Sequence, residues 1–206
     1  MKKRTRDPVR TRNHILEVAF REIFQHGFQG VSINEIIDKT DVTKGAFFHY
    51  FSTKQELGYA LVDEILKDLT LSRWIRPLAA YKNPVSGILK QLKKIIDDTP
   101  EERMALGCPL NNLIQEMSSV DPVFRDKLQA VLLLWIDEIE KHLVKARNDG
   151  YIKRNVDTRQ AAEFIVTVHE GGFGVAKSIR DKKIWHSVYG SLRKYLESIS
   201  SEGVSL

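Results

Sequence analysis

The stretch VSINEIIDKTDVTKGAFFHYF, residues 31–51, carries two helix-start signals that are separated by a very short turn. Ser32 stands three residues before Glu35, and this is the spacing of a capping box, which predicts a short helix ending near Thr40. Only two residues later, Thr43 can cap another helix. Two short helices joined by so tight a turn form a helix-turn-helix, in which the first helix holds the second out for insertion into a major groove.

The rest of the chain also has helical periodicity, because apolar residues recur at spacings of three and four and no segment alternates convincingly with period two. Capping side chains stand ahead of several of these patterns, at Ser52, Asn83, Asp121 and Asp157. We therefore predict an all-α fold of about nine helices, at residues 11–26, 32–40, from 43, 52–71, 84–98, 109–118, 122–148, 158–180 and 184–199.

The composition is that of a globular protein that stays in solution, since 42% of the residues are hydrophobic and 29% are charged. No apolar run approaches the ~20 residues that cross a bilayer, and the first six residues lead into a polar segment, so we expect a cytoplasmic protein. The single cysteine, Cys108, excludes an internal disulfide framework and an all-cysteine zinc site. We expect neither a metal nor a cofactor.

The basic charge is concentrated near the N-terminus. Residues 1–54 hold ten Lys and Arg against six Asp and Glu, a net charge of +4, whereas residues 55–206 hold 22 against 21, a net charge of +1. Such an asymmetry is expected where one module faces the phosphates of a nucleic acid and the other does not. A solvated basic tail would give the same distribution, and charge alone leaves both interpretations open.

The segment from Arg12 to Leu57 resembles the DNA-binding domain of the TetR family of bacterial regulators. The matching residues are Ile15, Leu16, Ala19, Phe24, Gly27, Phe28, Val31, Ser32, Ile33, Ile36, the run Val42–Phe51, Lys54 and Leu57. The resemblance implies a helix-turn-helix DNA-binding domain at residues 1–54 and a ligand-binding and dimerisation domain at residues 55–206. It further implies a homodimeric repressor that binds a palindromic DNA operator and is released by a small-molecule effector.

A recognition helix needs a buried face that locks it in place and an exposed face that comes close to the bases. Gly45 and Ala46 would permit such a close approach. Thr43 and Lys44 stand at the helix end that meets base edges and phosphates, and Lys54 can offer its charge to a phosphate. The candidate DNA-binding residues are Thr43, Lys44, Gly45, Ala46, Phe48, His49, Tyr50 and Lys54.

Several of these residues have an alternative interpretation. Lys44 and His49 would also suit an ordinary polar surface. Phe48 stands where the family often has tyrosine, so a hydroxyl contact with phosphate is missing there, and its ring fits packing as well as DNA contact. Phe47 and Phe51, four residues apart, are expected in the core.

By resemblance, the helices at 158–180 and 184–199 form a four-helix dimer interface with their copies. The last helix carries an apolar stripe that includes Trp185, Leu192 and Tyr195, and three glycines at 171, 172 and 174 indicate closely approaching backbones. A monomeric core would explain the same pattern. The middle helices are expected to enclose an effector site for a small, largely apolar ligand. Its candidate lining residues are Cys108, Leu110, Leu113, Ile114, Met117, Trp135, Phe164, His169 and Phe173.

Two other classes of function fit the sequence less well. An enzyme is the first, because His169 and Glu170 begin like a zinc-protease motif, but the second histidine is missing and no other ligand cluster replaces it. The glycines that follow lie in a helical pattern with no preceding strand, so they do not form a phosphate cradle. An architectural DNA-binding protein is the second class, and it leaves ~150 residues rich in apolar helices without a purpose.

Cys108 precedes Pro109, which can occupy the first position of a helix, so the sulfur can sit at a helix N-terminus. That position lowers the pKa of a thiol and would favour a thiolate that reacts with electrophiles or oxidants. The alternative is an inert cysteine that fills space beside Leu110 and Leu113.

Overall fold

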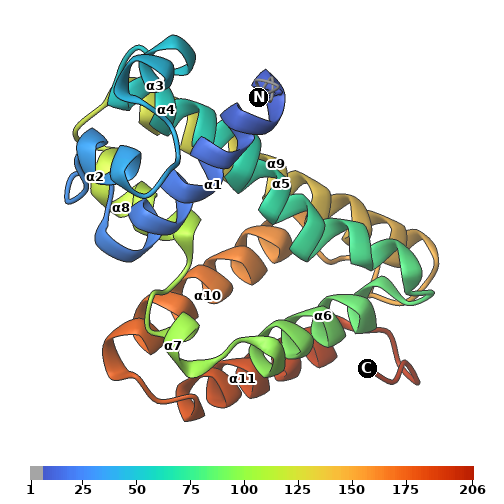
Figure 1. Cartoon of the computed structure of the whole chain (residues 1–206). Helices are drawn as coiled ribbons and strands as arrows, with labels where there is room; N and C mark the ends of the chain where they lie inside the picture. The colour runs from blue at the N-terminus through green and yellow to red at the C-terminus, as the bar shows by residue number, and fades with distance from the viewer. Residues whose placement is uncertain (1–6) are drawn as a thin grey trace. The chain divides into compact units, whose positions relative to one another are not determined.

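The structure, a computed structural model, describes residues 7–206, and Figure 1 shows that they form a helical protein. Its α-helices are α1 (Pro8–His26), α2 (Ile33–Asp38), α3 (Lys44–Tyr50), α4 (Lys54–Ala60), α5 (Lys67–Thr70), α6 (Pro84–Asp98), α7 (Glu101–Met104), α8 (Pro109–Met117), α9 (Pro122–Asn148), α10 (Thr158–Ile179) and α11 (Lys183–Ile199). The all-α prediction is confirmed: within residues 7–206 no strand forms, and one isolated bridge joins Ile152 to Ser200. No helix of this part of the chain is long and apolar enough to cross a membrane.

The helix starts follow the predicted capping signals with one shift. The capping box of Ser32 and Glu35 forms at α2, and the Thr43 hydroxyl accepts a hydrogen bond from the backbone N–H of Ala46 at α3. At α4, however, the N-cap is Thr53 and not Ser52, because the Thr53 hydroxyl accepts from the N–H of Glu56 at 3.1 Å. The Glu56 carboxylate in turn accepts a hydrogen bond from the backbone N–H of Ser52. An ionised carboxylate is a stronger acceptor than the neutral side-chain amide of Gln55, which stands three residues after Ser52.

The fourth predicted helix, residues 52–71, differs most from the structure. After α4 the chain stays helical as far as Ala80, through π-helical η1 (Leu61–Leu66), α5, π-helical η2 (Leu71–Ile75) and the 3-10 helix η3 (Arg76–Ala80). Pro77 lies at the start of η3 and has no backbone N–H, which explains why α-helical bonding does not resume there. π-helical turns are rare and are frequent at functional sites, so η1 and η2 mark this segment for closer attention.

The chain divides into two compact units. The first ends at Asp68 and also includes Asn112–Gln129, so that it contains α1 to α4, η1, most of α8 and the start of α9. Its core has a tight centre where Gly58 of α4 lies against the rings of Phe28 and Phe124, whose centroids are 4.7 Å apart. The boundary between the predicted domains, at residues 54 and 55, stays a proposal.

The second unit consists of Leu69–Asn111 and Ala130–Leu206. Within it, α10 packs against α11 and α7, and α6 runs beside α11, as Figure 1 shows. The apolar stripe of α11 faces inward in this packing, because Trp185, Leu192 and Leu196 are at most 1% exposed. The stripe therefore contributes to the core of the protomer, and Leu192 is not available for a contact between two copies of the chain.

Candidate functional site

The short helix α3 is held by its aromatic face. Phe47 is fully buried and Phe51, the residue that follows the helix, is 3% exposed, which confirms both as core residues. Their ring centroids lie 6.1 Å apart. Since both rings point into the first unit, the opposite face of α3 is left to solvent.

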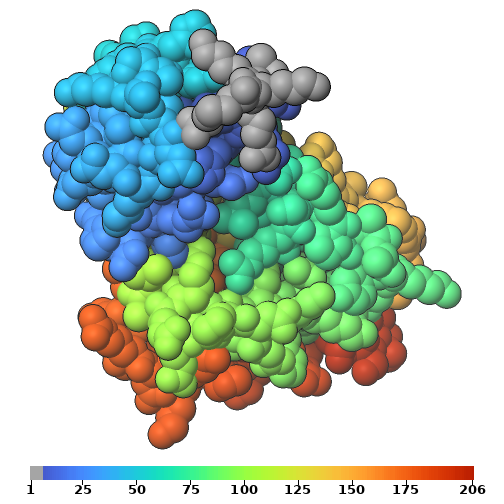
Figure 2. Space-filling model, in the orientation of Figure 1, coloured from blue at the N-terminus to red at the C-terminus, as the bar shows by residue number. Residues whose placement is uncertain are grey.

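The predicted DNA-binding residues gather on this free face and at the two ends of α3. Thr43, Lys44, Gly45, Phe48 and His49 are exposed, whereas Ala46, Tyr50 and Lys54 are half-buried. A β-carbon placed on Gly45 would meet nothing within 4 Å, so nothing within the chain restricts an approach to this point. Figure 2 shows α2 and α3, in blue, at the surface of the first unit. The position of Phe48, 39% exposed and edge-on to Phe47, fits both packing and DNA contact.

The ammonium group of Lys54 lies over the aromatic ring of Phe28. Its Nζ lies 4.7 Å from the centroid of Phe28, which is cation–π distance. Burial lowers the pKa of Lys54, and the nearby carboxylate of Glu116 acts in the opposite direction. The same carboxylate accepts hydrogen bonds from the backbone N–H groups of Phe28 at 2.9 Å and Gln29 at 2.7 Å. Glu116 thus fixes the turn after α1, and this turn carries the Phe28 ring that Lys54 contacts.

An ion pair in the first unit links α1 to η1. Both terminal nitrogens of the Arg12 guanidinium donate to the Glu64 carboxylate, at 2.7 and 2.6 Å, and the guanidinium carbon lies 5.1 Å from the ring centroid of Phe51. Sequence reasoning identified no role for Arg12, Glu64 or Glu116. The partners are separated by 52 residues in one case and by 88 in the other, and no local spacing signals such pairs.

In the second unit, aromatic rings surround His169 of α10. The imidazole centroid lies 4.3 Å from Trp74, 4.6 Å from Phe173, 5.2 Å from Trp135 and 5.7 Å from Trp185. His169 is 2% exposed, and burial together with the positive charge of Arg73 lowers its pKa well below the usual value. The imidazole is therefore neutral near pH 7.

Three buried polar atoms of this cluster have no hydrogen-bond partner among the described residues: Trp135 Nε1, His169 Nδ1 and Glu170 Oε2. Leaving one buried polar group without a partner costs about 1–3 kcal/mol, so three neighbouring ones need an explanation. The Glu170 carboxyl is part of the same pattern, because burial raises its pKa to about 7. Its other oxygen accepts a weak hydrogen bond from the thiol of Cys108 at 3.3 Å.

The structure brings together only some of the predicted effector-binding residues. Trp135, His169 and Phe173 meet in the aromatic cluster, and Cys108 reaches Glu170 beside it. Phe164 lies apart, 42% exposed, with its ring 4.5 Å from that of Tyr195. Leu110 is buried in the second unit, whereas Leu113, Ile114 and Met117 belong to the first. Trp74 and Trp185 also belong to this cluster but were not among the predicted effector-binding residues, because in the sequence each occupies an apolar position that is typical of an ordinary core.

Cys108 does not have the predicted thiolate character. Burial and the charge of Glu170 raise the pKa of the thiol well above its usual value, and they outweigh the backbone amides of Asn111 and Leu110, which act to lower it. The thiol therefore stays protonated and donates to Glu170. This supports the inert alternative and contradicts the lowered pKa that the helix N-terminus predicted.

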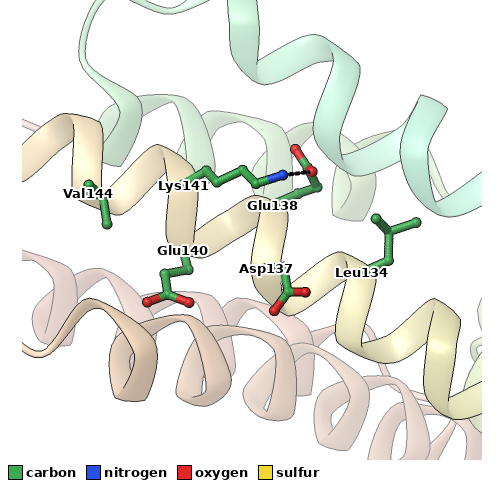
Figure 3. A pocket seen from close by; sticks show the side chains of 6 residues that line it. All are labelled: Leu134, Asp137, Glu138, Glu140, Lys141 and Val144. Atoms are coloured by element: carbon green, nitrogen blue, oxygen red, sulfur yellow. Dashed lines mark hydrogen bonds and ion pairs between the residues drawn. The ribbon is translucent and has the colours of Figure 1, made fainter.

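An open hollow on the surface of α9 is a different kind of feature. Figure 3 shows its lining residues, which are Leu134, Asp137, Glu138, Glu140, Lys141 and Val144. Its charges are paired, because Lys141 binds Glu138 and Arg159 of α10 reaches both Asp137 and Glu140. Each of these pairs is at least partly exposed to solvent, so the hollow offers no buried polar group that a ligand would satisfy.

Comparison with known proteins gives the same architecture. The family model described as "Bacterial regulatory proteins, tetR family" matches residues 15–61, and the model "Tetracyclin repressor-like, C-terminal domain" matches residues 86–191. The HTH-type transcriptional repressor DhaR of Mycobacterium sp. (strain GP1) is 25% identical over 203 residues, which cover 96% of this chain and 98% of that protein. An HTH-type transcriptional regulator in the lacX 3' region of Lactococcus lactis subsp. lactis is 27% identical over 192 residues, covering 93% and 96% of the two chains.

Solved structures match over almost the whole chain. A TetR transcriptional regulator from Chloroflexus aurantiacus superposes with a TM-score of 0.84 at 23% identity, covering 95% of this chain and 98% of the other. A TetR-family regulator from Cytophaga hutchinsonii has a TM-score of 0.83 at 20% identity, with 97% and 100% covered. At these identities the likeness shows that the fold is shared.

Proposed function

Because the chain belongs to the TetR family of bacterial transcriptional regulators, we propose that it is a repressor that binds a palindromic operator as a homodimer. A small-molecule effector that binds the second unit then releases it from DNA. Membership of this family confirms the prediction of a regulator over an enzyme, since the matched families and curated relatives are transcriptional regulators. The arrangement of α3 supports the DNA-binding part of the proposal most directly.

In this proposal, α3 is the recognition helix and residues 1–54 form the DNA-binding domain. Its buried aromatic residues fix its orientation, and its exposed N-terminal half presents Thr43, Lys44 and Gly45 to base edges and phosphates. Lys54, held above the ring of Phe28, binds a phosphate. Two copies of this helix reach half-sites about one helical turn, ~34–36 Å, or a multiple of it apart.

The surface proposed for dimerisation is the outward face of α10. Phe164, Val175 and Ile179 are 42%, 45% and 56% exposed, which is unusual for large apolar side chains on one helix. Gly171 lies between them on the exposed side, and a β-carbon there would meet nothing within 4 Å, so a second helix can approach the backbone closely. Four helices, α10 and α11 of each copy, build the interface in this arrangement.

Binding of the purified full chain to an operator-containing fragment and to a scrambled fragment of equal length tests the proposal. We expect saturable, salt-dependent binding that is at least about 10³-fold tighter for the operator at physiological salt. Lys44→Ala should weaken operator binding, whereas the matched control Lys94→Ala, an exposed lysine of α6 in the second unit, should leave it unchanged. Equal affinity for both fragments would refute the proposal.

A further inference from the structure

The three unpartnered atoms in the second unit belong to residues that contact each other or are adjacent along α10. Trp135 Nε1 belongs to a ring whose centroid is 5.2 Å from that of His169, and Glu170 is the next residue along α10. The Nε2 atom of His169 lies 3.9 Å from Glu170 Oε1, which also accepts from the Cys108 thiol. The atoms Trp135 Nε1, His169 Nδ1 and Glu170 Oε2 are thus buried without a hydrogen-bond partner among the described residues.

The hydrogen-bonding character of this region is mainly that of a donor. The indole N–H of Trp135 can only donate, and a neutral imidazole can donate from Nδ1. A carboxyl with a pKa of about 7 carries its proton in about half of the molecules at pH 7, and in that form Glu170 donates as well. A group with several acceptor lone pairs can therefore satisfy these donors.

The surrounding charge has the sign that suits an anion. The charge of Arg73 on η2 acts on His169, and Arg103 on α7 lies close enough to interact with both Arg73 and the Cys108 thiol. Burial and the charge of Arg73 lower the pKa of Arg103 to about 10, which shows that the two guanidinium groups repel each other in a partly buried place. The other titratable groups facing the region are the protonated thiol of Cys108 and, beside Arg73, the carboxylate of Asp98.

We propose that this site binds a small aromatic or unsaturated carboxylate, whose oxygens accept hydrogen bonds from Trp135 and Glu170 and whose apolar body packs among Trp74, Phe173 and Trp185. The inference rests on the proposed effector-controlled function and names the chemical class of the effector. The bound carboxylate requires the neutral form of Glu170, so that binding near pH 7 takes up a proton from solvent. An amine would suit the ionised carboxylate of Glu170, but it would face the charges of both arginines and leave the indole N–H without an acceptor.

Binding at this site must move helices, because Trp135, His169 and Glu170 are between 2% and 9% exposed. The elements that carry Arg73 and Trp74 on one side and Arg103 on another are π-helical η2 and the four-residue helix α7. A π-helical turn and a single-turn helix are less regular than a long α-helix, so we expect these two elements to rearrange first. A carboxylate that binds only the rearranged state shifts the equilibrium toward it.

The test uses the full-length protein and three probes that share one ring: benzoate, neutral benzamide and cationic benzylamine. Quenching of tryptophan fluorescence is titrated with each probe at pH 6, 7 and 8, and calorimetry in two buffers measures proton uptake. We expect saturable binding that is strongest for benzoate. Its affinity should fall about tenfold from pH 6 to pH 8, because the protonated fraction of a group with a pKa of about 7 falls from about nine-tenths to about one-tenth.

Two variants separate this role from a structural one. Glu170→Gln keeps a hydrogen-bond donor and removes the titration, so it should bind benzoate at pH 8 about as well as the wild type does at pH 6. Trp135→Phe keeps a ring without its N–H and should weaken benzoate binding about tenfold. The matched control is Tyr189→Phe, which removes a polar hydrogen from a half-buried aromatic residue of α11 outside the cluster and should leave benzoate binding unchanged. Circular dichroism shows whether each variant is folded.

The outcomes separate the ligand class from the function. Stronger binding of benzylamine than of benzoate, pH-independent binding of benzoate, or the same affinity in Trp135→Phe overturns the proposal. So does the absence of saturable binding by any probe, which would mean that water alone satisfies the three polar atoms. If benzoate binds as expected but operator affinity is unchanged, the ligand class holds and the effector-controlled function fails. If operator binding is specific but no carboxylate binds, the ligand class is wrong and the proposed DNA-binding function is unaffected.

Discussion

The substitution Gly58→Ala sets helix propensity against packing at the centre of the first unit. An alanine β-carbon at this position would lie 2.4 Å from Phe124 Cζ and 2.6 Å from Phe28 Cε2. Both phenylalanines are nearly fully buried, and their rings are in edge-to-face contact with each other, so neither can turn aside as a flexible side chain would. The rings, and with them α9 or the turn after α1, must shift.

The two effects have opposite signs. Replacing a glycine inside a helix by alanine stabilises the helix by about 1 kcal/mol. Adding a methyl group to a filled core costs about 1–3 kcal/mol, and two contacts well below 3 Å place this site at the upper end of that range. We therefore expect Gly58→Ala to lower the free energy of unfolding by about 1–2 kcal/mol, the net of the two effects.

Thermal and urea denaturation followed by circular dichroism measures this change. The matched control is Gly45→Ala at the start of α3, where the new methyl group meets nothing within 4 Å and stability should rise or stay the same. Operator affinity should fall in Gly58→Ala as well, because the displaced ring of Phe28 supports Lys54. A Gly58→Ala protein as stable as the wild type would show that the packing argument is wrong.

Four further results are expected. Glu116→Gln should destabilise the first unit by about 1–2 kcal/mol, since it removes the charge from two hydrogen bonds to backbone N–H groups, and an unchanged thermal midpoint would count against this. Burial raises the pKa of Glu170 to about 7 from 4.5, so the stability that the protonated carboxyl contributes is lost as pH rises from 4.5 through 7, on the order of 3 kcal/mol in total. Glu170→Gln should accordingly be more stable than the wild type at pH 8 and lose that advantage at pH 5, as thermal melts at the two pH values can check. Val175→Asp on the exposed face of α10 should convert dimer to monomer in sedimentation, whereas Val120→Asp, at another exposed apolar position, should leave the mass unchanged. Lys54→Ala should reduce the slope of log affinity against log salt by about one, and a slope equal to that of the wild type would exclude a phosphate contact.

Local signals in the sequence were sufficient for most of the helices, and the resemblance carried by residues 12–57 was sufficient for the class of protein. The capping box at Ser32 and the cap at Thr43 act over three residues, so the chain itself defines where α2 and α3 begin. The run of residues 42–51 then placed Phe47 inside and Lys44 outside, as the structure confirms. Such features need no partner from elsewhere in the chain, because helix periodicity and capping are properties of neighbouring residues.

What covers each apolar face was decided only by the tertiary structure. The periodicity of α11 marked Leu192 as part of an apolar stripe, but only the packing against α10 and α6 shows that the stripe belongs to the protomer. The structure leaves Phe164, Val175 and Ile179 of α10 exposed instead. The helix start at Pro109 predicted a lowered pKa for Cys108, and burial beside Glu170 reverses the direction. The physical reason is common to both: an amphipathic pattern states that a face avoids water, and a capping position states where backbone amides point. Neither carries information about which distant residues supply the contacts, the burial and the charge that determine the chemistry of the site.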